Sequence, residues 1–151
     1  MTSVNLILLA EDNPRDAELA LAAMEEHHIA DRVVVCQDGA EALDFLYCRG
    51  VFATRQKGNP TFVFLDLKMP KVDGIEVLRT IKNDVNLKPI PVVMLTSSRE
   101  ERDLARSYAL GANAYVVKPV EFHEFMKAVK ELAVFWGVIN ERPLEGSGPI
   151  D

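Results

Sequence analysis

The chain has 151 residues, of which 48% are hydrophobic and 26% are charged, and its formal net charge is −6. This composition is typical of one globular domain that is large enough to bury a core, and the negative charge argues against binding to nucleic acid or anionic lipid. No apolar run reaches the roughly 18 to 20 residues of a bilayer-spanning helix, and no signal peptide is evident. We therefore expect a cytoplasmic protein in which Cys36 and Cys48 are reduced thiols.

Strand and helix patterns alternate along the chain. Continuous apolar runs, which are typical of strands covered on both faces, predict strands at 4–10, 33–36, 61–66, 91–96 and 114–117. Periodic apolar stripes and helix-start residues predict helices at 14–28, 40–49, 75–81, 99–110 and 121–136. The apolar face of the second helix is expected to consist of Ala42, Leu43, Leu46 and Tyr47. Residues 50–60 lack a period and are predicted to form a loop.

The alternation predicts an α/β fold with a doubly wound five-stranded parallel sheet. Polar residues then stand where four of the strands end: Glu11 and Asp12 after the first, Asp66 at the end of the third, Thr96 at the end of the fourth and Lys118 after the fifth. The carboxyl ends of parallel strands lie at one edge of the sheet, where α/β proteins bind ligands. We therefore expect these five side chains to form one site.

Three carboxylates in one crevice need a counter-charge, because two of them about 4 Å apart repel by roughly 4 kcal/mol at an effective dielectric constant near 20. Among common ions, Mg²⁺ suits an all-oxygen site that retains water best. The hydroxyl of Thr96 and the ammonium of Lys118 could stabilise a transferring phosphoryl group. Asp66 lies centrally and can act as the nucleophile, because carboxylates form aspartyl phosphates.

Four motifs at these positions resemble those of a known family. The sequences AEDN, LDLKMPKVDG, LTSS and VVKP resemble the corresponding segments of the CheY-like receiver domain of two-component response regulators. Thr96 follows Asp66 by 30 residues, Tyr115 follows Thr96 by 19, and Lys118 comes three residues later. These separations match the spacing in that family.

The resemblance implies a flavodoxin-like sheet with strand order 2-1-3-4-5 and a phosphoryl transfer from a histidine kinase to Asp66. It implies that Asp12, Asp66 and the main-chain carbonyl of Lys68 hold Mg²⁺, and that Glu11 assists through water. Thr96 and Tyr115 would be the switch residues, and Lys118 would pair with the phosphoryl group. The only chemistry implied is the phosphorylation and dephosphorylation of the protein itself, so the chain is not expected to be an enzyme that acts on other substrates. A cis peptide bond is expected before Pro119.

The loop 50–60 and the segment FWGVINERPL resemble single-domain regulators that are paired with phytochrome-type histidine kinases. This resemblance implies a homodimer. We expect a receiver domain over 1–138 and, because the last residues are rich in Gly and Pro, a partly mobile tail over 139–151. Phe135 and Val138 lie off the main stripe of the last helix, which independently favours a second apolar contact. Output is expected to occur through contact with a downstream protein.

Two other functions compete with a phosphorylated switch. A phosphatase of the haloacid dehalogenase type also uses an aspartate at a strand end and Mg²⁺, but that family requires a second aspartate where this chain has Lys68. A receiver-like binding module that is never phosphorylated is expected to lack part of the acidic pocket. This chain keeps the five polar residues that the resemblance requires, which favours the switch.

Overall fold

The computed structural model describes residues 5–26, 28–96, 109–118 and 123–124. The strands are β1 (Ile7–Ala10), β2 (Val33–Cys36), β3 (Phe62–Asp66), β4 (Val92–Thr96) and β5 (Ala114–Val117). The helices within the described residues are α1 (Pro14–Glu25), α2 (Gly39–Tyr47) and α3 (Gly74–Asn83), with short 3-10 helices at Ala30–Arg32 and Gly50–Phe52. From β1 to β4, strands and helices therefore alternate as predicted. The helices predicted at 99–110 and 121–136 fall almost entirely outside the described residues.

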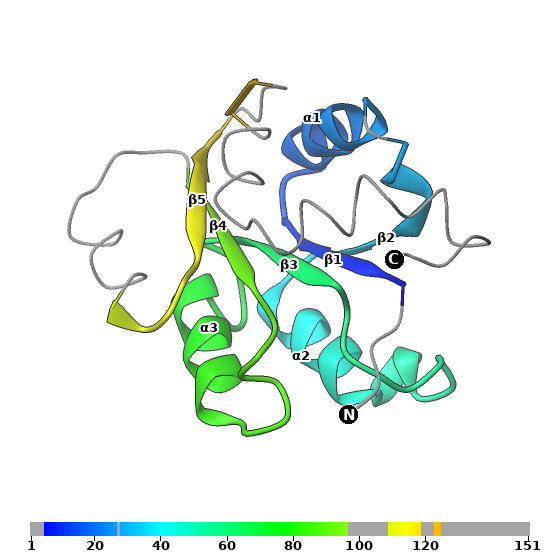
Figure 1. Cartoon of the computed structure of the whole chain (residues 1–151), viewed down its shortest axis with the longest axis vertical. Coiled ribbons are helices and arrows are strands. Elements are labelled where there is room, and N and C mark those ends of the chain that lie inside the picture. Colours follow the sequence, from blue (N-terminus) through cyan, green and yellow to red (C-terminus); the bar gives the residue numbers. More distant parts are fainter. Residues whose placement is uncertain (1–4, 27, 97–108, 119–122, 125–151) are drawn as a thin grey trace, which may run out of the picture.

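The strands form one five-stranded parallel sheet in the order β2-β1-β3-β4-β5. This arrangement confirms both the predicted fold class and the implied strand order. In Figure 1 the helix α1 lies on one side of the sheet, and α2 and α3 lie on the other. The two faces of a strand are covered in this way only if its side chains alternate between two apolar layers.

The core consists of these two layers, one on each face of the sheet. Ile7, Leu9, Phe62 and Phe64 pack with the buried residues of α1, whereas Leu8, Ala10, Val63 and Leu65 pack with those of α2 and α3. All four residues of β1 and all five residues of β3 are buried. This double burial explains why the strands read as continuous apolar runs and not as alternating ones.

Several predicted boundaries and one predicted face were wrong. The strand β1 begins at Ile7, and α1 ends at Glu25 instead of near residue 28. In α2 the buried face includes Phe45, while Tyr47 is 38% exposed. The phenol of Tyr47 instead donates a hydrogen bond to Oδ2 of Asp84, at 2.7 Å. A stripe predicted from periodicity alone cannot anticipate such a partner 37 residues away.

The loop 50–60 is held by Arg55. Its guanidinium lies 4.0 Å from the centre of the Phe45 ring, and Nε donates to the carbonyl of Phe45 at 2.8 Å. Further N–H groups donate to the carbonyls of Gln56 and Gly58. Because one side chain satisfies three main-chain carbonyls, this loop is anchored without an apolar core of its own. The loop contains one turn of 3-10 helix, Gly50–Phe52, which the sequence pattern did not predict.

Gly74 allows α3 to begin directly against the end of β3. Its N–H donates to the carbonyl of Leu67 at 2.9 Å. A Cβ atom at this position would lie 2.1 Å from the carbonyl oxygen of Asp66 and 2.9 Å from Cα of Leu67. Only glycine permits this approach, so the loop that follows Asp66 depends on it.

We therefore expect Gly74→Ala to destabilise the protein. Either α3 or the loop after β3 must shift to relieve the main-chain clash, at a cost of about 1 to 3 kcal/mol or more. The free energy of unfolding, measured in urea, should fall by this amount although alanine is the better helix former. An unchanged unfolding midpoint would contradict the close approach.

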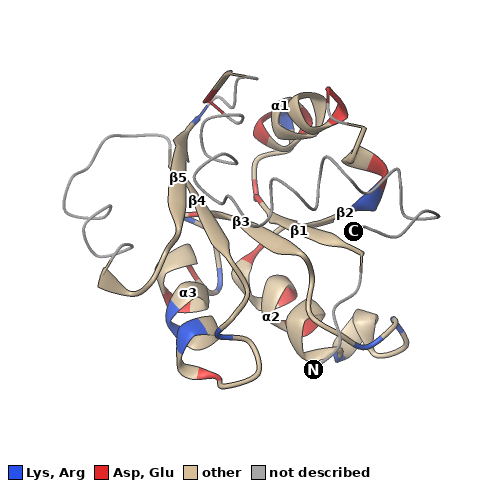
Figure 2. Cartoon of the chain, in the orientation of Figure 1, with Lys and Arg blue, Asp and Glu red and all other residues tan. Residues whose placement is uncertain are grey.

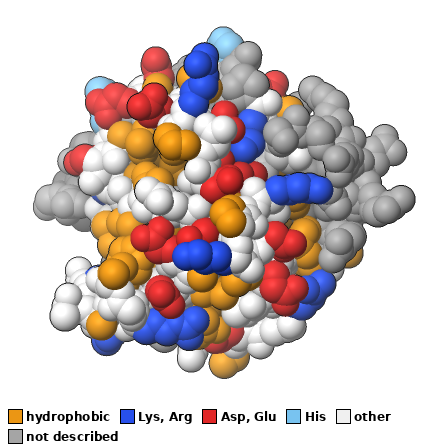
Figure 3. Space-filling view, turned by 180° about the vertical axis from the view of Figure 1, so that it is seen from behind, with side chains coloured by type: hydrophobic (Ala, Val, Ile, Leu, Met, Phe, Trp, Pro, Cys, Tyr) orange, Lys and Arg blue, Asp and Glu red, His pale blue; other side chains and the backbone are white. Residues whose placement is uncertain are grey.

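The surface of the described residues carries both signs of charge. Figure 3 shows Lys and Arg side chains interspersed with Asp and Glu side chains on the face seen from behind. Within the described part of the chain, none of the helices combines the length and the hydropathy that crossing a membrane requires. Cys36 and Cys48 are both free thiols, as predicted.

Candidate functional site

Three buried polar side chains stand out in the core of the described residues: Glu11, Asp66 and Thr96, with exposed fractions of 1%, 3% and 2%. Asp66 is the last residue of β3 and Thr96 is the last residue of β4, while Glu11 directly follows β1. Figure 2 shows acidic residues on the connection between β1 and α1, at the edge of the sheet where these strands end. Buried charge of this kind is costly unless it is paired or binds an ion.

The strand register brings these residues to one place. Ala10 lies opposite Leu65 in the ladder between β1 and β3, so Glu11 comes level with Asp66. Thr96 lies opposite Val117, and the N–H of Lys118 donates to the carbonyl of Thr96 at 2.7 Å. The parallel ladders therefore place all the predicted strand-end residues at the carboxyl edge of the sheet.

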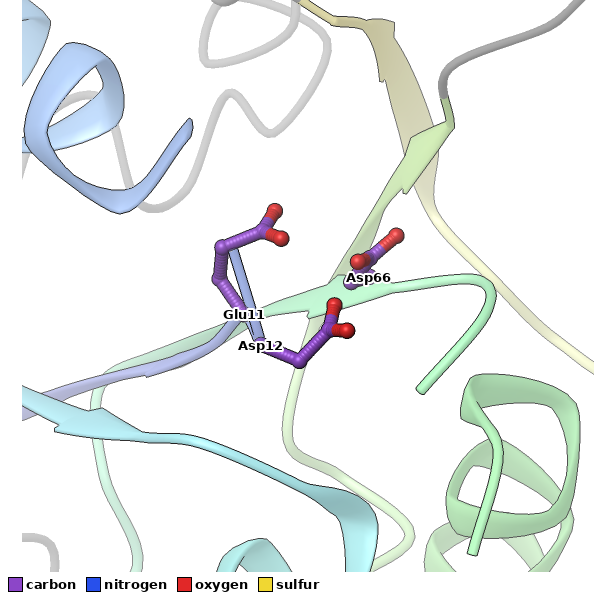
Figure 4. Close-up of side chains that lie close together, drawn as sticks. All are labelled: Glu11, Asp12 and Asp66. Atoms are coloured by element: carbon purple, nitrogen blue, oxygen red, sulfur yellow. The ribbon is translucent and has the colours of Figure 1, made fainter. Parts of the chain in front are cut away.

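The carboxylates of Glu11, Asp12 and Asp66 form an acidic group. Each offers an oxygen atom, and these atoms all lie within 4.8 Å of one another. Figure 4 shows the three side chains close together where β1 and β3 end, with the carboxylate of Asp12 directed toward Asp66. Glu11 and Asp66 are buried, whereas Asp12 is exposed and lies at the open side of the group. An all-oxygen donor set with one solvent-facing member fits a hard divalent cation.

The ammonium of Lys118 joins this group from the end of β5. Its Nζ lies 3.1 Å from Oδ2 of Asp66 and 3.1 Å from Oε1 of Glu11, and its side chain is 8% exposed. It also lies 3.1 Å from Oδ2 of Asp16, in the first turn of α1. Burial lowers the pKa of Lys118, but the charges of Asp66, Asp16 and Glu11 outweigh this effect and raise it, so the amine is held as an ammonium.

Sequence reasoning missed Asp16. A signal was available, because a helix that begins just after β1 must have its first turn at the same edge of the sheet as Asp66. An acidic residue in that turn was a candidate for the site. Its carboxylate is 24% exposed and contacts Lys118, which the pattern of strand ends alone could not predict.

Burial of Asp66 and the neighbouring Glu11 carboxyl raise the pKa of Asp66 from 3.8 to about 7, and the Lys118 ammonium only partly offsets this rise. The main chain adds one long contact, in which the N–H of Lys68 donates to Oδ1 of Asp66 at 3.4 Å. In the absence of a cation, the acidic group therefore binds a proton more readily than an isolated aspartate does.

This pKa predicts how the stability of the metal-free protein depends on pH. The folded state binds the proton of Asp66 more tightly than the unfolded state does, so proton binding stabilises the folded state. This stabilisation is complete below about pH 4 and is lost as the pH rises through about 7. At about 1.4 kcal/mol per pKa unit, the loss is a few kcal/mol. Urea unfolding with a chelator between about pH 5 and pH 8 should reveal it as the difference between wild type and Asp66→Asn. A difference that does not change with pH would contradict the raised pKa.

The other predicted residues differ in where they lie. Lys68 is exposed on the loop after β3, and Thr96 is buried at the end of β4. Tyr115 is 37% exposed, and it lies on the face of β5 opposite to the buried Ala114 and Val116. The bond to Pro119 and the predicted contact residues Phe135 and Val138 lie outside the described residues.

The acidic group and Lys118 lie in a part of the chain whose sequence matches a known family. The model of the response regulator receiver domain matches residues 7–130. The chain belongs to the response regulator receiver family. This membership confirms the family resemblance noted in the sequence and places the receiver domain in two-component signalling. A histidine kinase is the partner that the family implies.

Several proteins of known identity are similar to this receiver domain. It is 39% identical over 138 residues to the probable methanogenesis regulatory protein FilR2 of Methanothrix harundinacea, covering 91% of this chain and 87% of that protein. It is 37% identical over 131 residues to the response regulator Rcp1 of Synechocystis, covering 87% and 88%. The solved bacteriophytochrome response regulator AtBRR is 60% identical with a TM-score of 0.80, and the match covers 89% of this chain and 96% of that one.

Two more solved receiver structures carry a ligand or a modification. The Mn²⁺-bound form of Rcp1 is 34% identical with a TM-score of 0.71, covering 88% of this chain and 94% of that one. The phosphorylated cyanobacterial phytochrome response regulator RcpA is 38% identical with a TM-score of 0.73, covering 89% and 94%. Phytochrome response regulators are thus prominent among the relatives of this receiver domain.

Proposed function

We propose that Asp66 accepts a phosphoryl group from a phosphohistidine of a sensor kinase. The observation that supports this role is the ammonium of Lys118, 3.1 Å from Oδ2 of Asp66, beside the carboxylates of Glu11 and Asp12. A carboxylate oxygen that faces a fixed ammonium can attack phosphorus while the developing charge on the phosphoryl oxygens is neutralised. The O–P bond to Asp66 forms as the P–N bond to the imidazole breaks, and the electron pair returns to the imidazole nitrogen.

The acidic group is proposed to hold Mg²⁺. Glu11, Asp12 and Asp66 supply hard oxygen donors, and the main-chain carbonyl of Lys68, in the loop after β3, is proposed as a further ligand. The Mn²⁺-bound form of Rcp1 supports a divalent ion in a receiver of this type. When bound, the ion supplies positive charge that displaces the proton from Asp66 and neutralises phosphoryl oxygens.

Thr96 and Tyr115 are proposed as the switch. Thr96 ends β4 beside Lys118, and Tyr115 stands half-exposed on the edge strand β5. A shift of such a two-state element from mostly inactive to mostly active requires roughly 5.5 kcal/mol of differential stabilisation. New bonds from Thr96 and Lys118 to a phosphoryl group are the proposed source of this energy.

The kinase is proposed to be of the phytochrome type, which the 60% identity to the bacteriophytochrome response regulator AtBRR supports. The receiver domain is proposed to end by residue 138, with 139–151 as a tail, and to form a homodimer that acts on a downstream protein in the cytoplasm. Sedimentation at micromolar concentration tests the dimer, and a monomer both with and without phosphorylation would refute it.

The phosphoacceptor role is tested with the small phosphodonor acetyl phosphate. Incubation of the wild type with Mg²⁺ and acetyl phosphate should add one labile phosphoryl group to the intact mass, and a chelator should prevent this gain. Borohydride reduces an aspartyl phosphate to homoserine, so peptide mass spectrometry after reduction should find homoserine at position 66. A wild type that gains no phosphoryl group, or gains it elsewhere, would refute the proposal.

A further inference from the structure

Asp16 contacts the site from outside the acidic group. It occupies the first turn of α1, and its Oδ2 lies 3.1 Å from Nζ of Lys118. The group that fits a cation consists of Glu11, Asp12 and Asp66, and Asp16 is not part of it. Asp16 therefore interacts with the site through the lysine alone among the contacts that the structure describes.

The ammonium of Lys118 lies among three carboxylates, and it contacts both oxygens of Glu11. An ammonium has three N–H donors, and Nζ lies 3.1 Å from a carboxylate oxygen of each of Glu11, Asp16 and Asp66. Two of these acids, Glu11 directly after β1 and Asp16 in α1, hold the ammonium, and the third is the proposed acceptor. The ammonium thereby also donates to Oδ2 of Asp66, the side chain that would carry a phosphoryl group.

Asp16 differs from Glu11 in how it would respond to a cation. A divalent ion in the acidic group would compete with Lys118 for the charges of Glu11 and Asp66, and would repel the ammonium at close range. The ion would not compete for Asp16, whose carboxylate would still attract Lys118 with its full charge. It is therefore the contact that would hold Lys118 at the site when the ion is present.

We propose that Asp16 is a positioning residue, which holds the ammonium of Lys118 toward Asp66 during phosphoryl transfer. This inference rests on the proposed function of Asp66. An ordinary alternative is that Asp16 only stabilises the start of α1, where a negative charge is favourable. However, the side chain of Asn13 already accepts from the N–H groups of Arg15 and Asp16, so the helix is capped without the Asp16 carboxylate.

The test compares rates of phosphoryl gain from acetyl phosphate with Mg²⁺, followed by intact mass. Asp16→Ala should be slower than wild type by about tenfold, which is typical when a group that orients a functional residue is lost. Asp16→Asn keeps an acceptor oxygen and should recover part of the rate. Glu18→Ala removes an exposed acid from the same helix and should stay within about twofold of wild type.

A double-mutant cycle separates positioning from a structural effect. If Asp16 acts through Lys118, Asp16→Ala should cause no further slowing in a Lys118→Ala background. Equal slowing in both backgrounds, or a wild-type rate in Asp16→Ala, would overturn the positioning role. A wild type that gains no phosphoryl group at all would instead overturn the proposed function and this role with it. Urea unfolding of all variants should give similar midpoints for Asp16→Ala and Asp16→Asn.

Discussion

Asp66→Asn is expected to gain no phosphoryl group under conditions in which the wild type gains one. The amide keeps the shape of the side chain at the end of β3, but its oxygen is a poor nucleophile and carries no charge for a cation or for Lys118. Intact mass after incubation with Mg²⁺ and acetyl phosphate checks this directly. The matched control is Asp31→Asn, an exposed aspartate in the 3-10 helix that precedes β2.

The control should be phosphorylated at the wild-type rate, because the 3-10 helix at Ala30–Arg32 leads into the amino end of β2, at the opposite edge of the sheet. A phosphoryl group on Asp66→Asn would mean that another carboxylate, such as Glu11 or Asp12, can replace the acceptor. Loss of phosphorylation in both variants would point to misfolding, which urea unfolding detects.

Lys118→Ala is expected to slow phosphoryl gain by about 10²- to 10³-fold, the effect of removing one fixed electrostatic partner of a transition state. The same variant should bind Mg²⁺ more tightly, because a positive charge 3.1 Å from both Glu11 and Asp66 is removed. Titration calorimetry with Mg²⁺ and intact mass with acetyl phosphate measure the two effects. Slower phosphoryl gain together with tighter Mg²⁺ binding would distinguish a lost catalytic contact from a collapsed site.

Lys118→Arg is the charge-preserving control for this variant. Its planar guanidinium cannot direct three donors at three carboxylates as an ammonium does, so its rate should lie between those of wild type and Lys118→Ala. Weaker Mg²⁺ binding in Lys118→Ala would contradict the electrostatic account of the site.

The position of Asp66 could be predicted from the sequence because the apolar run of its strand and the layout of a parallel sheet indicate the same place. A short run of apolar residues fits a strand that is covered on both faces, and a carboxylate at the end of such a strand lies at the carboxyl edge of a parallel sheet. The same argument located Glu11 and Lys118. In the structure, Nζ of Lys118 lies 3.1 Å from Oε1 of Glu11. The places of these residues at the strand ends depend on the main chain alone.

Contacts that depend on how one element packs on another could not be predicted in the same way. Periodicity indicated an apolar face on α2, but Phe45 is buried partly because Arg55, ten residues later, stacks on its ring. The contact between Asp16 and Lys118 joins side chains from α1 and β5, and it depends on their rotamers. Sequence patterns within single elements carry no information on either pairing.

The loop anchored by Arg55 has a practical consequence. It leads into the amino end of β3, whereas Asp66 lies at the carboxyl end of the same strand, so the length of the strand separates the two. Gln56 and Lys57 are exposed at the surface of this loop. A reporter group attached through the side chain of Lys57 would leave the acids and Lys118 in place, which makes the loop an attachment point for a biosensor of signalling state.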